Sequence, residues 1–574
     1  MRSTFIYKDH KLLYFIRHGE SLANEQNYFA GTLDSPLTRL GRRQAREAAA
    51  GIRKLDLDFD EVHISTLGRA RETAQIVLGD DLARHARIVF TDALIERDFG
   101  IFAGENKTLL KKSLGYERFD HFIHDPAGTP PGGESWMDMY ARCRKYYDEV
   151  LAPLEQAGKR ILVVAHKYIV EVFALIASGR SPSEYLDFKL PNSRPLSWDD
   201  LRTLTSSSSS ALNRIADHVE IYLPHWALGG ALAGFALALL DMTPSAALTN
   251  VMVLLLLAVN AFFLALRIDA SALDPRRESH RASLVTLSLV RVAIGGWLLF
   301  LVSEAWARPI GLLLLMPPAL SVPTFSLSRG GDYFFAARNT LLLSVLFPLA
   351  LLAASYVAPG VATDPDGLKR FFIILVVAIA VPIALAQKWR IRNAITAGRI
   401  TTNWSWLGSL ATVPLAFLGT ASTASSSLAS DLRSGEPGVY ASLLIPLLTL
   451  ALIRAGSALY VRLQPMFGGK EIAPPIASDL HLLQTLPNIF LWFSLLMPGM
   501  RDEHPSLIAG TMLGFFVFAF VDEAIVVARF RARVQLVMDS MLGRSRPRPR
   551  RPAHARSFNQ VRDSAVGSNS QFES

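Results

Sequence analysis

The sequence predicts an α/β domain at the N-terminus, followed by an all-α polytopic membrane domain of about ten helices. Short apolar runs alternate with amphipathic helical patterns over the first two hundred residues. A polar low-complexity tract, TSSSSS, then occupies 205–210, and from about Tyr222 onward apolar stretches of membrane-spanning length dominate. We therefore divide the 574 residues into an α/β domain (1–204), a Ser-rich linker (205–220), a transmembrane domain (221–530) and a basic, disordered tail (531–574).

The overall composition hides two unlike halves. Hydrophobic residues make up 50% of the chain, yet the first two hundred positions are rich in charged side chains. The one cysteine, Cys143, excludes an internal disulfide framework and suits a reducing compartment. The N-terminus has no long apolar core with a cleavage site, so we expect a cytoplasmic N-terminal domain. Much of the net charge of +9 lies in loops between apolar stretches and in the tail, which favours membrane topology over nucleic-acid binding.

Within the first domain, short apolar runs predict strands, and apolar residues recurring every three or four positions predict helices. The predicted strands are 12–16, 61–64, 88–90 and 160–165, and the predicted helices are 39–54, 70–78, 136–156 and 169–178. This alternation is typical of a mainly parallel sheet flanked by helices. His18, Ser65 and His166 each follow a predicted strand, so we expect them to meet at the carboxyl edge of the sheet, where ligands bind.

Ten apolar stretches follow the linker, each near the ~20 residues that a membrane span requires. They are 222–240, 246–266, 284–306, 309–325, 336–358, 370–387, 404–421, 439–460, 482–500 and 506–528. Arg and Lys concentrate in alternate loops, and the positive-inside rule then places both termini in the cytoplasm. We therefore expect a multi-pass protein of the plasma or inner membrane, in contact with the lipid bilayer, whose basic run at 544–551 is a disordered cytoplasmic anchor.

Three ionisable residues in the apolar stretches are candidates for an intramembrane function: Arg291, Asp522 and Glu523. Charged groups inside a bilayer are costly and often mark function. The Asp522–Glu523 pair, with Arg291 or Arg454 opposite, would then line a polar path. The alternative is a helix-end side chain or an interhelical ion pair. The stretch 291–356 resembles aromatic-acid-exporter-like membrane proteins, but no motif in it assigns a role to a residue.

The stretch 13–24, LYFIRHGESLAN, carries the clearest chemistry. An apolar strand pattern breaks at the sequence RHGES, where Gly19 permits a sharp turn and Ser21 suits a helix N-cap. A histidine delivered by a strand end, beside an arginine and ahead of a helix N-terminus, suits phosphate chemistry.

Five further segments follow in order: LTRLGRRQA (37–45), STLGRARETA (65–74), LIERDFG (94–100), GGES (132–135) and VVAH (163–166). With RHGES and Asn24, they resemble the pattern of the histidine phosphatase superfamily, the phosphoglycerate-mutase-like proteins, over residues 10–200. The motif ERDFG and the short segment before GGES resemble the broad phosphatase branch more than glycolytic mutases.

The resemblance implies a phosphoric monoester hydrolase that needs neither a metal nor another cofactor. The residues it implies are the nucleophile His18, which would form a phosphohistidine, the general acid and base Glu96, and the phosphate-binding residues Arg17, Asn24, Arg69 and His166. The residue types fit this chemistry. Guanidinium forks match phosphate oxygens, and clustered positive charge keeps an imidazole unprotonated near neutral pH. For Glu96 the alternative is a surface salt bridge with Arg97.

Lys167 departs from the family pattern, which usually has Gly after the second histidine. This lysine would narrow the pocket, add a cation for a more anionic substrate, or mark lost activity. The leading hypothesis is hydrolysis of a small-molecule or lipid-linked phosphate monoester. The alternatives are a phosphomutase, a phosphate-binding pseudoenzyme, and a transporter or channel with a fused regulatory phosphatase. The sequence leaves the substrate and the oligomeric state open.

Overall fold

The computed structural model describes residues 12–183 and 193–203, and separate stretches of the later chain. The longest of these stretches are 222–240, 245–268, 281–300, 375–392, 406–421, 437–467 and 505–541. The predicted linker, the predicted span at 482–500 and the tail beyond Met541 lie almost entirely outside the described residues. The chain divides into two compact units, Met1–Ser210 with Ala528–Ser574, and Ala211–Val527.

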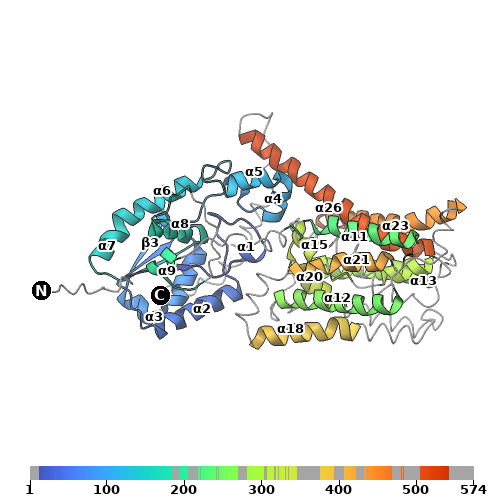
Figure 1. The fold of residues 1–574 in the computed structure, drawn as a ribbon, viewed down its shortest axis with the longest axis horizontal. Coiled ribbons are helices and arrows are strands. Elements are labelled where there is room, and N and C mark those ends of the chain that lie inside the picture. Colours follow the sequence, from blue (N-terminus) through green and yellow to red (C-terminus); the bar gives the residue numbers. More distant parts are fainter. Residues whose placement is uncertain are drawn as a thin grey trace. The chain divides into compact units, whose positions relative to one another are not determined.

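A five-stranded sheet in the order β3-β2-β4-β1-β5 forms the centre of the first unit (Figure 1). Its parallel strands are β1 (Leu13–Arg17), β2 (Glu61–Ser65), β3 (Arg87–Thr91) and β4 (Ile161–Ala165), and β5 (Leu196–Ser197) runs antiparallel to β1. The four parallel strands lie where the sequence predicts them, because each is a short apolar run. Strand β5 was not predicted, since two residues show no periodicity. The N-terminal α/β domain is thus confirmed, with a mixed sheet.

Helices cover both faces of this sheet because successive strand residues point to opposite sides (Figure 1). Tyr14 and Ile16 pack against α2 (Arg39–Lys54) and α3 (Gly68–His85). Leu13 and Phe15 pack on the other side against α6 (Trp136–Tyr146) and α8 (Lys167–Ser178). The shorter elements of the unit are α1 (Leu22–Glu25), η1 (Asp92–Leu94), η2 (Gly100–Phe102), α4 (Lys107–Leu114), α5 (Tyr116–Ile123), η3 (Tyr147–Leu151), α7 (Ala152–Gln156) and α9 (Trp198–Thr203).

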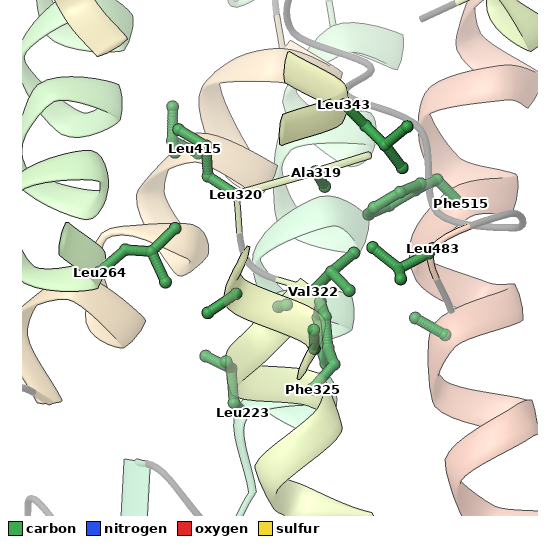
Figure 2. Packing of buried hydrophobic residues seen from close by; sticks show 14 of the residues in the cluster. Leu223, Leu264, Ala319, Leu320, Val322, Phe325, Leu343, Leu415, Leu483 and Phe515 are labelled. Carbon is green, nitrogen blue, oxygen red and sulfur yellow. The ribbon is translucent and has the colours of Figure 1, made fainter. Parts of the chain in front are cut away.

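The described part of the second unit consists of helices. They are α11 (Leu223–Leu239), α12 (Ala246–Arg267), α13 (Arg281–Phe300), α14 (Ala307–Leu314), α15 (Val322–Ser328), η6 (Leu375–Ala380), α18 (Val381–Arg392), α20 (Trp406–Leu410), α21 (Thr412–Ala421), α23 (Pro437–Leu463), η7 (Gln464–Phe467) and the first part of α26 (Pro505–Met541). These helices share a buried apolar cluster that includes Leu223, Leu320, Phe325 and Phe515 (Figure 2).

The predicted membrane domain of about ten helices is wrong. Among the described residues, no helix combines the length and the apolar composition needed to cross a bilayer. Some predicted spans correspond to short helices, such as the 8 residues of α14 and the 5 residues of α20. Longer helices carry charged residues within them, such as Arg291 in α13, Arg454 in α23 and Asp522 in α26. The multi-pass localisation rested on those spans and is corrected with them.

Arg291, a predicted functional residue of this unit, is buried on α13. Its Nε donates to the carbonyl of Leu314 at 2.9 Å, and a terminal N–H donates to the carbonyl of Leu483 at 3.0 Å. Burial lowers the pKa of Arg291 to about 9. Two backbone carbonyls therefore hold this side chain between helices.

Asp522 and Glu523 are also buried, on α26. Asp522 accepts a hydrogen bond from Arg454 at 3.1 Å and forms a second ion pair with Arg329, a partner that the sequence did not single out. Burial acts to raise the pKa of Asp522, but the two guanidinium groups hold it below its ordinary value. The geometry is an interhelical ion-pair network, and a function for these residues stays a prediction.

Candidate active site

The end of β1 brings His18 beside His166. The backbone N–H of His18 donates to the carbonyl of Ala165 at 2.9 Å, which continues the parallel pairing of β1 with β4 by one residue. The two imidazole rings lie with their centroids 5.0 Å apart, and both side chains are buried. The histidines therefore meet at the carboxyl edge of the sheet, as the strand pattern indicated.

The contacts of His18 define its tautomer. Its Nδ1 lies 2.6 Å from the carbonyl oxygen of Gly19, which only accepts, so Nδ1 carries the proton. Nε2 then has a free lone pair, and the Nε–H of Arg69 donates to it at 3.3 Å. Burial places the pKa of His18 well below its ordinary value, and the charges of Arg69 and Arg17 lower it further. His18 is thus neutral, with Nε2 available as a nucleophile.

Two glycines allow the His18 loop to lie directly against α2. A Cβ on Gly19 would lie 2.4 Å from the carbonyl oxygen of Gly41, and a Cβ on Gly41 would lie 2.1 Å from that of Glu20. On the other side, the N–H of Gly19 donates to Oγ1 of Thr73 at 3.0 Å. The glycine of the LTRLGRRQA segment and the threonine of STLGRARETA therefore hold the catalytic loop in place.

Arg69 is held rigidly beside His18. Arg69 is the second residue of α3 and is 1% exposed. Its terminal nitrogens donate to the carbonyls of Leu33 at 2.8 Å and Gly31 at 2.7 Å. Burial lowers its pKa to about 10, so the guanidinium remains charged at neutral pH. Each terminal nitrogen carries a second N–H, which suits a phosphate oxygen.

Arg17 and Asn24 flank the same loop. Burial lowers the pKa of Arg17, while the carboxylates of Glu96 and Glu171 act to raise it. The Oδ1 of Asn24 accepts from the backbone N–H of Ser21 at 3.2 Å and from its hydroxyl at 3.1 Å. Because Oδ1 faces Ser21, the Nδ2 amide of Asn24 is the group with hydrogens to offer a phosphate.

His166 makes its hydrogen bond through the other ring nitrogen. Its Nε2 lies 2.8 Å from Oγ of Ser65, at the end of β2. Within the described residues, its Nδ1 has no hydrogen-bond partner. Burial and the charge of Arg69 hold the pKa of His166 well below its ordinary value, so the ring is neutral. If the Ser65 hydroxyl donates to Nε2, the proton sits on Nδ1, which becomes a donor toward the space beside His18.

Replacing Ser65 by Ala should lower kcat/KM roughly 10-fold, because His166 then loses the bond that sets its tautomer. The melting temperature should change little, since the substitution removes one oxygen and keeps Cβ. Steady-state kinetics and thermal unfolding on the full chain measure both quantities. Ser178→Ala is the matched control, since that hydroxyl bonds the carbonyl of Ala174 at the opposite end of α8. Equal kinetics in the two variants would contradict the role of Ser65.

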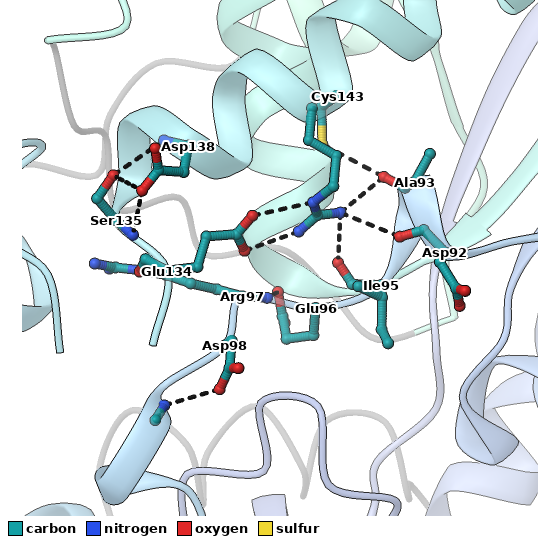
Figure 3. Close-up of polar contacts among 12 residues, drawn as sticks. Asp92, Ala93, Ile95, Glu96, Arg97, Asp98, Glu134, Ser135, Asp138 and Cys143 are labelled. Carbon is teal, nitrogen blue, oxygen red and sulfur yellow. Dashed lines mark hydrogen bonds and ion pairs between the residues drawn. The ribbon is translucent and has the colours of Figure 1, made fainter. Parts of the chain in front are cut away.

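Glu96 lies in a segment that is held by two arginines, the buried Arg97 and the partly buried Arg142 (Figure 3). Arg97 is fully buried and donates to the carbonyls of Ile123 at 2.7 Å and Gly128 at 3.0 Å. Arg142 binds both carboxylate oxygens of Glu134 and donates to carbonyls of the Glu96 segment, which are Ala93 at 2.8 Å and Ile95 at 3.0 Å. Glu96 and Arg97 are both buried, so the surface salt bridge considered from the sequence is wrong.

The environment of Glu96 favours its protonated form. Burial raises the pKa of this carboxyl group, although the backbone N–H of Arg97, at 3.0 Å from Oε1, and the charges of Arg69 and Arg17 oppose the shift. A carboxylic acid that keeps its proton to higher pH than usual is better suited to protonate a leaving group. Arg69, which donates to Nε2 of His18, is also one of the charges that act on the pKa of Glu96.

Lys107 is a site residue that sequence reasoning missed. Burial and the neighbouring cations Lys167 and Arg17 lower its pKa to about 8, and Glu96 acts in the opposite direction. Lys167 itself lies 3.4 Å from Oε1 of the buried Glu171. Lys107 lies outside every quoted motif, seven residues after LIERDFG (94–100) ends, and only the turn residues before it, GEN, are typical of a helix start there. Lys107 therefore joins Lys167, the lysine that the sequence singled out, as a second lysine among these charged groups.

No group of three or more His, Cys, Asp or Glu side chains suited to a metal ion occurs in the described parts of the chain. The metal-independent reaction stays a prediction. The one cysteine, Cys143, is buried on α6, and burial raises its pKa to about 12. A thiol in that state packs against its neighbours and is a poor nucleophile.

Comparisons with known proteins concern the same residues. Residues 13–198 match the profile of the histidine phosphatase superfamily (branch 1). Two similar proteins are the 2,3-bisphosphoglycerate-dependent phosphoglycerate mutases of Azorhizobium caulinodans (33% identical) and Bradyrhizobium diazoefficiens (34%), each over 32% of this chain and 90% of the relative. A solved mycobacterial glucosyl-3-phosphoglycerate phosphatase in complex with VO3 is 25% identical over 32% of this chain and 90% of its own, with a TM-score of 0.28.

Proposed function

This chain belongs to the histidine phosphatase superfamily, and from that premise we propose that it hydrolyses a phosphate monoester through a phosphohistidine on Nε2 of His18. One observation carries the proposal. A neutral His18, with its lone pair on Nε2, lies beside a charged Arg69, and the same Arg69 acts on Glu96, a carboxyl group whose pKa is raised by burial. Nucleophile, charge stabilisation and general acid are the three parts that such a reaction requires.

In the first step, Nε2 of His18 attacks phosphorus while the bond from phosphorus to the ester oxygen breaks. Glu96 gives its proton to that oxygen, and the alcohol leaves. Arg17, Arg69 and the Nδ1–H of His166 stabilise the charge on the transferring phosphoryl oxygens. The Nδ1–H of His18, bonded to Gly19, holds the ring in the attacking orientation.

In the second step, water attacks the phosphohistidine and the bond from Nε2 to phosphorus breaks. The Glu96 carboxylate takes a proton from this water, which restores the acid for the next cycle. Nε2 leaves with its lone pair, so His18 returns to its starting tautomer. Inorganic phosphate is the product.

A second candidate function is a phosphomutase, which uses the same phosphohistidine but passes the phosphoryl group to another hydroxyl. It is favoured by the similarity to proteins named phosphoglycerate mutases over 90% of their length. Hydrolysis is preferred because the ERDFG segment and the short connection to GGES match the broad phosphatase pattern. Lys107 and Lys167 suit a substrate with a further anionic group, whether the ester is lipid-linked or a small molecule.

The test is a phosphate-release screen with the full chain over p-nitrophenyl phosphate and lipid, sugar, nucleotide and phosphoglycerate esters. Hydrolysis predicts inorganic phosphate from at least one ester class. A mutase instead interconverts 2- and 3-phosphoglycerate with little phosphate release. Binding of phosphate esters without turnover in either assay would identify a pseudoenzyme and overturn the proposal.

A further inference from the structure

The last part of α26 packs on the phosphatase fold, far from it in sequence. Residues from Ala528 onward belong to the same compact unit as residues 1–210. The guanidinium of Arg533 binds the carboxylate of Glu105 at 2.6 Å, across 428 positions of the chain. We propose that residues 528–541 form a brace for the active site, in which the Arg533–Glu105 ion pair positions Lys107.

The brace holds α4 at both ends. Glu105 lies two residues before the first residue of α4. At the other end, Arg531 donates to the carbonyl of Ser113 at 2.9 Å and approaches that of Lys112 at 3.4 Å. These carbonyls lie in the last turn of α4, where a cation satisfies unpaired acceptors and complements the helix dipole.

The segment that Arg533 holds is tied to the wall of the active site. Phe29 exchanges backbone hydrogen bonds with Gly104 at 2.7 Å and with Glu105 at 3.0 Å. The N–H of Lys107 donates to the carbonyl of Asn27 at 2.9 Å. Residues 27–29 directly follow the short helix that carries Asn24. A shift of Glu105 therefore moves the backbone that carries Lys107.

The side chain of Lys107 extends from this backbone and adds a positive charge near the proposed active site. Its ammonium lies over the ring of Phe29, 5.3 Å from the centroid. The charged groups that act on its pKa are Lys167, Arg17 and Glu96, and the last two belong to the proposed active site. A cation at this place attracts the substrate's negative charge, so its position affects substrate binding more than the bond-breaking step.

A second contact of the brace reaches the GGES loop. The methyl group of Met541 lies beside Gly132, where a Cβ would be 3.1 Å from it. The same loop contains Glu134, which holds Arg142 and through it the segment of Glu96. The brace thus touches both segments that carry charged groups to the site.

The Arg533–Glu105 ion pair is largely shielded from water, so solvent screens the attraction between the two charges less than at the surface. The side chains of Arg533 and Glu105 are 29% and 21% exposed. Burial raises the pKa of Glu105, and Arg533 acts against that shift. Without Arg533, a mostly buried carboxylate would lose its partner and the segment would reorganise around it.

The inference rests on the proposed function, and the test uses the full chain. In Arg533→Gln, KM for p-nitrophenyl phosphate should rise roughly 3- to 10-fold while kcat stays within about 2-fold. Glu105→Gln should behave alike, and the exchanged pair Glu105→Arg with Arg533→Glu should recover KM to within about 2-fold. Arg529→Gln, an exposed arginine on the same helix, is the matched control. Variants that match this control in KM would overturn the brace.

The pH dependence separates positioning from general stabilisation. In the unmodified protein KM should rise above about pH 8, where Lys107 loses its proton. In Arg533→Gln this rise should shift to higher pH, because a released lysine gains water and its pKa returns toward ~10.4. If KM depends on pH in the same way in Arg533→Gln and in the unmodified protein, the Arg533–Glu105 contact does not position Lys107, and the proposal is contradicted.

Hydrogen exchange supplies a readout that needs no turnover. Amides of residues 104–114 should exchange faster in Arg533→Gln than in Arg529→Gln. If the unmodified chain hydrolyses no ester, the proposed function fails, and the exchange rates still decide the brace. Equal rates in the two variants would overturn it.

Discussion

Replacing His18 by Ala should abolish turnover, with a fall in kcat of about 10⁴-fold or more, because the covalent route loses its nucleophile. The unmodified chain should also form an acid-labile phosphoenzyme, which this variant should lack. The label is measured after the reaction with a radiolabelled ester is stopped in base, since phosphohistidine hydrolyses in acid.

The control for this prediction is His121→Ala, which removes an exposed imidazole on α5 and should keep full activity. Thermal unfolding should show that both variants are folded, because neither change leaves a large apolar cavity. A phosphoenzyme in His18→Ala would assign the nucleophile to another residue and contradict the proposed reaction.

Replacing Glu96 by Gln should have the second largest effect, and its size should depend on the leaving group. For an alkyl phosphate kcat/KM should fall about 10²- to 10⁴-fold, since the alkoxide needs a proton. For p-nitrophenyl phosphate the fall should be much smaller, because nitrophenolate leaves without one. Parallel kinetics on both esters measure the difference, and equal losses would contradict the role of Glu96 as the acid.

The pH profile gives the sign of the same prediction. Burial raises the pKa of Glu96, so the acid form persists to higher pH than for an ordinary carboxyl group. With an alkyl ester, kcat/KM of the unmodified protein should fall as pH rises through this raised pKa, because the proton donor is lost. Gln does not titrate, so this fall of kcat/KM with rising pH should be absent in Glu96→Gln. Glu117→Gln, an exposed change on α5, should retain it.

Local patterns predicted most of the phosphatase fold. The four parallel strands are short apolar runs, and α2 spans the predicted 39–54. The alignment of His18 and His166 at one edge follows from parallel strand pairing, which any βα alternation favours. Strand β5 was missed because its two residues are too few to show a strand pattern, and only their pairing with the distant β1 makes them a strand.

The same local reasoning failed in the second half of the chain. Long apolar stretches were interpreted as membrane spans, and alternating basic loops supported that interpretation. Apolar composition does not determine where a helix starts and stops, and the described helices do not meet the requirement for a span. Asp522 likewise pairs with Arg329 and Arg454, a choice that depends on which helices pack together.

The sequence by itself determined which residue types the site contains and where along the chain they occur, because strand ends and helix starts follow from nearby residues. The tertiary structure alone decided what those residues do. The Gly19 carbonyl fixes the proton of His18 on Nδ1, the Ser65 hydroxyl pairs with Nε2 of His166, and burial raises the pKa of Glu96. The tertiary structure also places Arg533 beside Glu105, although the two residues are 428 positions apart in the sequence. Hydrogen-bond partners and desolvation depend on groups distant in sequence, which local periodicity does not encode.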